Sequence, residues 1–541
     1  MSTRPAAPRR RRDGGNLRDL PLDGDGPLYG QIYRAMRAAI LAGRARPGVR
    51  LPTTRALARE LGCSRNTVVA AFEPLRAEGY VVTRVGAGTF VTAPPSPATS
   101  RPAGAPTSAP VSLGAPAAAP VLSRYGRALR DGDPRRVYDG ALASSAPPWD
   151  FRPCVPELED LSYDAWRRQL VRTAHHLPTR AFDYADPAGD PTLRETIAAY
   201  LARARGVECR AEDVLVVGGV AQALDLASRL LLDAGDGVLL EDPHYLGARR
   251  VFEAAGARLV GAPVDGEGVD LGAVAAERLA GCRLAYVTPS HQFPTGSVLS
   301  LGRRLALLDW ATAANAFVIE DDYDSEFRYA GRAIPSMKSL DTAGRVIYVG
   351  TFSKTLLPSL RIAYVVAPPP LAPLFRTAKW MADWSAPGFE QAALARFLET
   401  GEFERHLRRA RTLYAERRAA LVEALAERAG VFRPVWRDSQ AGLHLLVRFP
   451  EWPATRIDAL LRAARERGLG LYPAAPCYLE RAPDALELVM GFGRLSPARL
   501  CEGVSKLAEL LAAPAPARAS DPPPARPGHP AADRGWSEKK P

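Results

Sequence analysis

Lysine is scarce in this chain of 541 residues. Against 65 arginines stand six lysines, at positions 338, 354, 379, 506, 539 and 540. A guanidinium group is effectively always protonated, so arginine cannot supply the neutral amine that forms an imine with an aldehyde. A lysine in so arginine-rich a chain therefore marks a candidate position for a reactive amine.

Other absences narrow the class of protein. The chain lacks the apolar run of about 18 residues that a membrane helix needs, and its basic start, MSTRPAAPRRRR, lacks the apolar segment of a secretory signal. No C-x-x-C pair and no histidine at ligand spacing accompany the cysteines, which are Cys63, Cys154, Cys209, Cys282, Cys477 and Cys501. We therefore expect a cytoplasmic protein with reduced thiols and no metal site.

The positive charge is concentrated at the N-terminus. Residues 1–93 contain sixteen arginines, no lysine and seven acidic residues, which gives +9 of the formal +12. A small basic module on a nearly neutral body is typical of proteins that bind nucleic acid, although a solvated basic face is the alternative.

Composition divides the chain into five parts. Residues 94–120 hold eight prolines and eight alanines, too little apolar surface to fold. Proline and alanine become frequent again after about residue 513. The expected parts are a disordered basic arm (1–24), a DNA-binding domain (25–93), a Pro/Ala-rich linker (94–145), a large domain (146–512) and a disordered tail (513–541).

The basic module has the pattern of a winged helix. A helix starting near Leu28 stops before Gly43. Thr53 or Thr54 can cap a second helix and Ser64 a third, with Gly62 in the turn between them. Residues 81–91 (VVTRVGAGTFV) predict a two-stranded wing. This arrangement places the third helix in a major groove of DNA.

The large domain alternates short apolar runs with longer amphipathic segments. The runs are DVLVV (213–217), GVLLE (237–241), RLAYV (283–287), FVIED (317–321), RVIYV (345–349) and RIAYVV (361–366). Strands alternating with helices indicate an α/β domain with a largely parallel sheet.

Lys354 follows one of these predicted strands, in Y-V-G-T-F-S-K-T-L-L-P-S-L-R (348–361). Thr351, Ser353 and Arg361 around it could bind a phosphate. Gly218 and Gly219 open another turn, after which amides near Val220 and Ala221 start a helix, and such a helix end also binds phosphate.

An acidic run, E-D-D-Y-D-S-E-F-R-Y (320–329), follows another predicted strand. A carboxylate there could pair with the protonated ring nitrogen of pyridoxal phosphate and maintain its electron sink. A solvated acidic loop or a divalent-ion site would have the same composition.

Residues 25–92 resemble the GntR-type winged helix, most specifically in L-P-T-T-R-A-L-A-R-E-L-G-C-S-R-N-T-V. The resemblance implies that the start of the third helix faces DNA and that Arg84 with the wing approaches the backbone or minor groove. Arginine suits guanine and asparagine suits adenine. The expected DNA-binding residues are Arg55, Ser64, Arg65, Asn66, Thr67 and Arg84.

Residues 149–500 resemble a fold-type-I aminotransferase, and the whole chain resembles the MocR/GabR family. The motifs are D-Y-A-D-P-A-G-D-P-T-L-R (183–194), E-D-P-H-Y (241–245), T-P-S-H-Q-F-P-T-G (288–296), E-D-D-Y-D-S-E-F and T-F-S-K-T-L. The fold implied is a large mixed or parallel sheet with helices and a smaller C-terminal lobe.

The resemblance also implies roles around pyridoxal phosphate. Lys354 would form the imine with its aldehyde, Asp321 would hold the ring nitrogen, Tyr323 would contact the ring hydroxyl and Tyr245 would stack on the ring. Thr351, Ser353 and Arg361 would bind the phosphate, together with the turn at Val220 and Ala221. Tyr184 would reach the phosphate of a neighbouring subunit, which implies a homodimer.

Three positions depart from the pattern of the resemblance. Ala221 stands where the family usually has glutamine. Phe293 stands where classical aminotransferases place an asparagine on the ring hydroxyl, with Gln292 as a substitute. Val489 stands where those enzymes carry the arginine that clamps a substrate carboxylate.

We therefore expect a DNA-binding transcription regulator that holds pyridoxal phosphate and senses an amine, an amino acid or pyridoxal phosphate itself. The missing clamp favours the last and predicts weak or absent turnover. The alternatives are a working aminotransferase with an appended DNA-binding domain, and a DNA-binding protein with a vestigial, cofactor-free domain.

Overall fold

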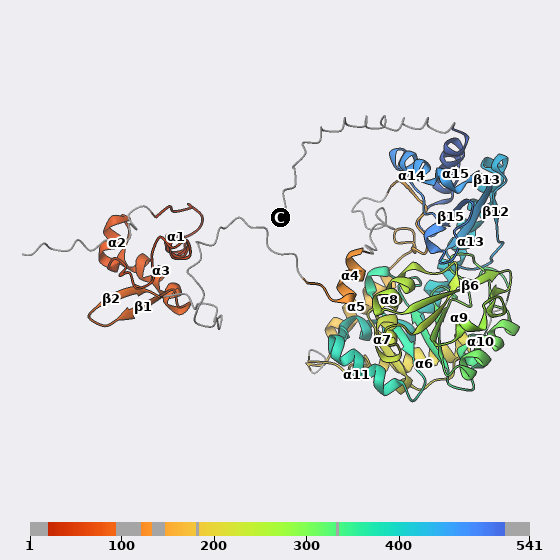
Figure 1. The fold of residues 1–541 in the computed structure, drawn as a ribbon, viewed down its shortest axis with the longest axis horizontal. Coiled ribbons are helices and arrows are strands. Elements are labelled where there is room, and N and C mark those ends of the chain that lie inside the picture. The colour runs from red at the N-terminus through yellow and green to blue at the C-terminus, as the bar shows by residue number, and fades with distance from the viewer. Residues whose placement is uncertain (1–19, 93–120, 132–146, 180–182, 332–334, 514–541) are drawn as a thin grey trace, which may run out of the picture. The chain divides into compact units, whose positions relative to one another are not determined.

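The structure is a computed structural model that describes residues 20–92, 121–131, 147–179, 183–331 and 335–513. The chain divides into two compact units, Met1–Ala118 and Ala119–Pro541, which are described separately (Figure 1). The predicted tail and most of the predicted basic arm and linker lie outside the described residues.

The first unit is a helix-turn-helix with a wing. The Thr53 hydroxyl accepts a hydrogen bond from the Ala56 amide, and the Ser64 hydroxyl accepts one from the Thr67 amide, so both helices begin at the predicted caps. Ile32, Met36 and Leu57, among other apolar side chains, form its core. Its elements are α1 (Leu28–Leu41), α2 (Thr54–Glu60), α3 (Arg65–Ala77), β1 (Val81–Arg84) and β2 (Gly88–Val91).

The second unit is built on an eight-stranded sheet that contains all six predicted strands. Strands β10, β9, β8, β5 and β6 run parallel to one another, whereas β11 is antiparallel to both β10 and β4, and β7 is antiparallel to β6. The expectation of a large, mostly parallel sheet is confirmed. Its order is β4 (Val214–Val217), β11 (Ala363–Val366), β10 (Val346–Thr351), β9 (Phe317–Asp322), β8 (Cys282–Val287), β5 (Gly237–Asp242), β6 (Arg258–Asp265) and β7 (Gly268–Val269).

Helices cover both faces of this sheet, and for that reason its strands are apolar on both sides. On β4, Leu215 and Val217 pack with α7 and α8, whereas Val214 and Val216 pack with α6 and α12. The helices of this part are α5 (Asp164–His176), α6 (Pro191–Arg205), α7 (Val220–Leu231), α8 (Leu246–Ala255), α9 (Ala276–Leu279), α10 (Leu301–Ala313), α11 (Ala372–Asp383) and α12 (Gly388–Glu399).

A smaller lobe follows, with an antiparallel sheet of order β12-β13-β15 beside α14 and α15 (Figure 1). Its elements are α13 (Glu402–Arg428), β12 (Val435–Trp436), β13 (His444–Pro453), α14 (Ile457–Glu466), β15 (Ala485–Gly491) and α15 (Pro497–Ala512). The short strands β3 (Trp149–Asp150) and β14 (Leu469–Gly470) pair in parallel and tie the segment before α5 to this lobe.

One stretch inside the predicted linker is helical. Helix α4 (Arg124–Asp131) packs beside α8, and the Arg124 guanidinium donates to the Gly256 carbonyl oxygen at 3.4 Å. No helix in the described ranges is long and apolar enough to cross a membrane.

Candidate functional site

A cavity of about 290 Å³ lies where β8, β9 and β10 end and α7 begins. Parallel strands bring their carboxyl ends to one edge of a sheet, which is the usual place for a ligand in an open α/β fold. The cavity is lined by Arg152, Pro153, Cys154, Val220, Ala221, Tyr245, Tyr286, Thr288, Phe293, Asp321, Tyr323, Thr351, Ser353, Lys354 and Arg361. Nine of the ten residues expected around the cofactor are among them.

One side of the cavity is built to receive an anion. Helix α7 begins at Val220, and its first amides have no carbonyl partner within the helix. A Cβ atom at Gly219 would lie 2.3 Å from a terminal nitrogen of Arg361, so the absence of a side chain lets that guanidinium reach the helix start. The Ser353 hydroxyl is buried and has no hydrogen-bond partner among the described residues.

Arg361 also has an unusual backbone. Its φ of +50° is left-handed, which is uncommon for a residue other than glycine. The neighbouring backbone is fixed as well, because the Ser353 amide donates to the Thr351 hydroxyl at 3.1 Å. Such a conformation persists only where the surrounding structure imposes it, and it often accompanies a binding site.

Asp321 stands at the end of β9 and lines the same cavity. The Tyr286 hydroxyl donates to its Oδ2 at 2.6 Å, whereas its Oδ1 is buried and unpartnered within the described part of the chain. Burial raises the pKa of Asp321 to about 7, against the lowering effect of the Tyr286 hydrogen bond. An unsatisfied buried carboxylate oxygen is costly, and a protonated ring nitrogen would satisfy it.

These features fit pyridoxal phosphate. The anion site would take the phosphate, Asp321 Oδ1 would face the ring nitrogen, and Lys354 supplies the amine for the aldehyde. Tyr245 flanks the same cavity, and its ring meets that of Phe293 edge to face with 5.9 Å between centroids.

Tyr184 is the expected cofactor residue that does not line this cavity. It is 79% exposed, and its ring centroid lies 5.3 Å from that of Trp384. An exposed position agrees with a role toward another subunit.

The expectation that Gln292 substitutes for the missing asparagine is wrong. Its amide nitrogen donates to the carbonyl oxygens of Pro243 and Phe293 and lies 3.2 Å from Glu241, so it braces a loop and does not line the cavity. Phe293 itself forms the wall at this place.

The other two departures are also apolar residues, of which Ala221 lines the cavity. The neighbouring Gln222 turns away, because its amide oxygen accepts from the Gly218 amide and its nitrogen donates to Asp383. Val489 is buried in an apolar cluster with Cys154 and other wall residues.

Several cavity residues were missed by sequence reasoning. Arg152 lines the cavity wall and forms an ion pair with Asp150 at 3.1 Å. The Nε atom of Arg152 donates to the Tyr472 hydroxyl at 3.3 Å. Cys154, beside it, has a left-handed φ of +57° and a thiol whose pKa is raised by burial. Both come from the segment after β3, far from the other motifs in sequence, and no local pattern marks them.

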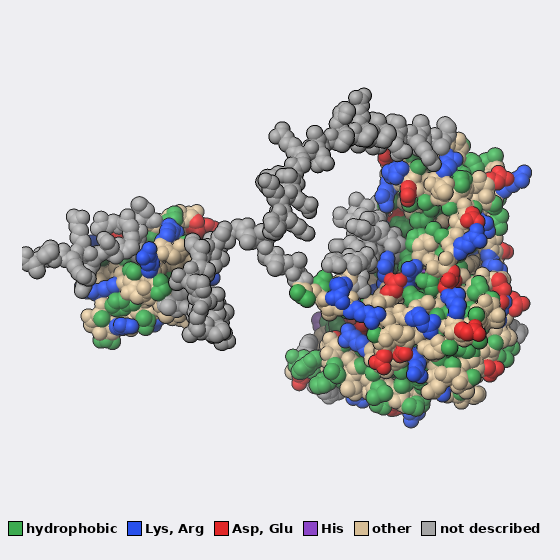
Figure 2. All heavy atoms as spheres, viewed as in Figure 1, with side chains coloured by type: hydrophobic (Ala, Val, Ile, Leu, Met, Phe, Trp, Pro, Cys, Tyr) green, Lys and Arg blue, Asp and Glu red, His purple; other side chains and the backbone are tan. Residues whose placement is uncertain are grey.

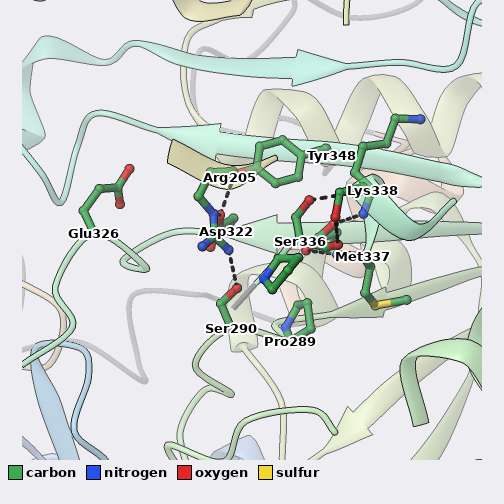
Figure 3. Close-up of polar contacts among 12 residues, drawn as sticks. Arg205, Pro289, Ser290, Asp322, Glu326, Ser336, Met337, Lys338 and Tyr348 are labelled. Atoms are coloured by element: carbon green, nitrogen blue, oxygen red, sulfur yellow. Dashed lines mark hydrogen bonds and ion pairs between the residues drawn. The ribbon is translucent and has the colours of Figure 1, made fainter. Parts of the chain in front are cut away.

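Asp322, next to Asp321, belongs to a different polar cluster (Figure 3). Its Oδ2 accepts from Nε of Arg205 at 2.6 Å and also from the Tyr348 hydroxyl. Arg205 donates in turn to the Ser290 hydroxyl at 2.7 Å. Successive side chains of a strand point to opposite faces, so this buried ion pair supports β9 from the face that Asp321 does not use.

In the first unit, the residues expected to contact DNA lie at and just before the start of α3, on α2 and on the wing. Arg55, Ser64, Arg65 and Asn66 are exposed, whereas Thr67 is half-buried with its hydroxyl 2.8 Å from that of Ser64. The Arg84 guanidinium lies over the Phe90 ring at 5.3 Å. The hydroxyl of Ser64 therefore has a capping role besides any contact with DNA.

Both units match known protein families. Residues 28–91 match the bacterial regulatory proteins of the gntR family, and residues 155–504 match aminotransferase class I and II. The probable rhizopine catabolism regulatory protein MocR of Rhizobium meliloti is 39% identical over 90% of this chain and 94% of its own. The chain belongs to the family of MocR-like helix-turn-helix transcriptional regulators.

Two further relatives extend the comparison. The pyridoxine biosynthesis transcriptional regulator PdxR of Corynebacterium glutamicum is 30% identical over 86% of this chain and 91% of its own. Among solved structures, the multiple substrate aminotransferase of Thermococcus profundus is 27% identical with a TM-score of 0.65, over 72% of this chain and 97% of that one. The last match covers the large unit without the winged helix.

The pKa of Asp321 predicts how stability depends on pH in the cofactor-free protein. A carboxyl group whose pKa is about 7 in the folded protein and 3.8 in the unfolded protein lowers the free energy of unfolding as the pH rises from the second value to the first. We expect Asp321→Asn to be more stable than the wild type above pH 7, by roughly 1–4 kcal/mol, and to lose this advantage toward pH 4.

Urea unfolding of both proteins at pH 5 and pH 8 measures the difference. Glu241, whose pKa burial also raises to about 7, is present in both proteins, but its contribution cancels only in part, because the charge of Asp321 also raises the pKa of Glu241. An advantage of the same size at both pH values would contradict the raised pKa.

Proposed function

We propose that this protein is a cytoplasmic transcription regulator that binds double-stranded DNA through its winged helix and holds pyridoxal phosphate as part of a sensing site. The observation that carries the proposal is the cavity whose lining includes Lys354, Asp321 with its unpartnered oxygen, and the anion site at the start of α7. The family assignment supplies the regulatory role, and the cavity supplies the chemistry.

The proposal includes a homodimer. Tyr184, Trp380, Met381 and Trp384 are between 49% and 79% exposed, and the rings of Trp380 and Trp384 lie 6.0 Å apart. Figure 2 shows hydrophobic side chains gathered over the region of α11, which carries Trp380 and Met381 and is followed directly by Trp384. An exposed apolar patch of this kind is typical of an interaction site, and a second copy covering it would bring Tyr184 toward the partner's cavity.

The signal is an amine, an amino acid or pyridoxal phosphate itself. Val489 removes the expected carboxylate clamp, which favours the cofactor as signal, and PdxR is a relative whose name refers to pyridoxine biosynthesis. Arg152, however, places a guanidinium on the wall, which supports an amine that also carries an acidic group. Whichever ligand acts must bind two states of the protein with different free energies, or it cannot switch DNA binding.

Borohydride reduction of the cofactor-loaded protein tests the site. We expect one modified lysine per chain, at Lys354, because the other described lysines are engaged elsewhere. Lys338 and Lys379 pair with Asp341 and Asp383, and Lys506 lies over the Trp149 ring. Peptide mass mapping identifies the modified residue.

Lys354→Ala should lose the visible absorption and remain folded, with Lys506→Ala as the matched control. Modification at another lysine, or a reducible adduct in Lys354→Ala, would remove the assignment.

Arg65 provides the test of the DNA interface. If Arg65 reads a base, Arg65→Ala should cost about 1–3 kcal/mol on the operator and much less on random DNA. Arg76→Ala, at the far end of the same helix, is the control and should change neither. Binding isotherms at two salt concentrations separate base reading from phosphate contact, which equal losses on both DNAs would indicate.

A working aminotransferase is the second candidate, because the cofactor side of the cavity is complete. Transamination needs a substrate whose Cα–H bond is held across the ring, and loss of positioning can cost on the order of 10²-fold in rate. With Val489 in place of the clamp, we expect turnover far below the ordinary range of roughly 1–10³ per second. Steady-state assays with common amino donors and keto acids decide, and rates inside that range would favour the enzyme.

A further inference from the structure

Behind Tyr323 lies a group of buried polar side chains that the cofactor roles described above do not use. His291 and His444 have ring centroids 5.0 Å apart, and a carboxylate oxygen of Asp324 lies within 4.8 Å of a ring nitrogen of each. The side chains of His291 and Asp324 are 0% and 2% exposed.

Donors and acceptors can be assigned to the hydrogen bonds within this group. Nδ1 of His291 lies 3.0 Å from Oδ2 of Asp324 and 3.1 Å from the hydroxyl of Tyr323. An ionised carboxylate only accepts, so Nδ1 carries the hydrogen and points it between the two oxygens. The Tyr323 hydroxyl donates its single hydrogen to the backbone carbonyl oxygen of His291 at 3.0 Å and would turn it to the ring oxygen when the cofactor binds, whereas Nδ1 of His291 can donate to the hydroxyl oxygen in both arrangements. One histidine therefore holds the tyrosine hydroxyl from both sides.

The histidine ring is itself fixed. Its Nε2 is buried and finds no hydrogen-bond partner in the described part of the structure. A Cβ atom at Gly442 would lie 1.9 Å from Cε1 of His291, and one at Gly296 would lie 3.3 Å from Nε2. Both glycines have positive φ, so the ring is enclosed by backbone that glycine permits. A ring packed so closely cannot turn away from Tyr323 without moving this backbone.

We propose that His291 and Asp324 are positioning residues that orient the Tyr323 hydroxyl toward the ring oxygen of the cofactor and thereby set the pH at which the bound cofactor changes colour. The inference rests on the proposed binding of pyridoxal phosphate. Phe293 stands where classical aminotransferases direct a second hydrogen-bond donor, an asparagine, at that oxygen, so this chain lacks that donor. Tyr323 is therefore the residue expected to donate to the ring oxygen, and His291 holds the Tyr323 hydroxyl in place.

Burial keeps the tyrosine a donor, because it raises the pKa of the Tyr323 hydroxyl well above its usual value. A hydrogen bond from this hydroxyl stabilises the more negative, deprotonated form of the bound cofactor. Weakening the bond therefore raises the pH midpoint of the visible absorption. Other titratable or charged groups that face this region are Asp321, Tyr286, Lys354, Cys154, Tyr245, Arg361, Arg152, Glu241 and His444.

The same three side chains could gather around a metal ion, but their hydrogen bonds favour the positioning role. His444 is occupied on both ring nitrogens, by the Pro294 carbonyl oxygen at 3.2 Å and by the Cys154 sulfur at 3.4 Å. The free Nε2 of His291 faces the glycines, whereas Nδ1 is shared by Asp324 and Tyr323.

The experiment is a pH titration of the visible band in the full-length, cofactor-loaded protein. Loss of one hydrogen bond is expected to raise the midpoint by about 0.4–1 pH unit in His291→Gln. Tyr323→Phe should raise it at least as much, and adding His291→Gln to Tyr323→Phe should change nothing further. His444→Gln, a histidine of the same cluster without contact to Tyr323, is the matched control and should keep the wild-type midpoint.

Asp324→Asn provides a second route if His291→Gln does not fold, and it should move the midpoint in the same direction by less. An unchanged midpoint in His291→Gln, an equal shift in His444→Gln, or additive shifts in the double variant would each overturn the proposal. So would one zinc per chain that His444→Gln removes. A wild-type protein that shows no visible band would instead overturn the proposed function, and the two failures are thus distinguishable.

Discussion

The burial of carboxylates at the end of β9 is the constraint on which the large unit depends. Glu320, Asp321, Asp322 and Asp324 fall within five residues and are all at most 5% exposed. Charges of one sign so close together destabilise one another and are costly to remove from water. Each carboxylate therefore requires its own arrangement, and these arrangements determine which distant segments meet.

The partners of these four carboxylates come from different segments of the chain. Glu320 accepts the backbone amides of residues 337 and 338, and Asp322 pairs with Arg205 from the end of α6 (Figure 3). Asp324 takes the histidine of the loop after β8. Asp321 receives one hydroxyl and keeps one oxygen unsatisfied at the cavity. Glu320 and Asp324 are hydrogen-bonded and hold the strand end and its loops in place, whereas Asp321 and Asp322 each keep one oxygen without a partner among the described residues. Of these two residues Asp321 lines the cavity, where a ligand can complete its contacts.

What the sequence could predict follows from how local each signal is. The six strands, the caps at Thr53 and Ser64 and the cavity position of Lys354 depend on residues close together in the chain. The same is true of the phosphate side, since motifs at the ends of parallel strands meet at one edge whatever the rest of the fold does. Helix α4 was concealed by the composition of its surroundings, because proline and alanine are frequent on its N-terminal side.

The pairs that no pattern marked join residues far apart. Arg205 and Asp322 are 117 positions apart, and His291 and Asp324 are 33 apart, so their meeting depends on the strand order. Gln292 was misjudged for a related reason. Its place in the motif is correct, but the loop turns its amide toward Glu241 and two carbonyl groups whose burial would otherwise leave them unpaired.

The scarcity of lysine was informative but not sufficient. Lys379 is fully buried and ion-paired with Asp383 at 2.7 Å, which is a structural task that the rarity argument did not foresee. Lys354 differs from Lys379 because it lines a cavity that also contains an anion site and an unsatisfied carboxylate oxygen. Composition narrowed the candidates, and geometry selected among them.

The loss of the carboxylate clamp involves more than one residue. Val489 packs with Cys154, Phe293 and Tyr323, so the space that an arginine would cross is filled from three segments. A Cβ atom at Gly491 would lie 2.0 Å from the carbonyl oxygen of Arg152, which shows how closely the segment after β3 crosses β15. Val489→Arg alone would bury a charge against an apolar wall, which is costly without a partner. The cavity wall that Cys154 and Phe293 form is therefore apolar, and an acidic group of a ligand would meet the guanidinium of Arg152 instead, beside the carboxylate of Asp150 with which it pairs.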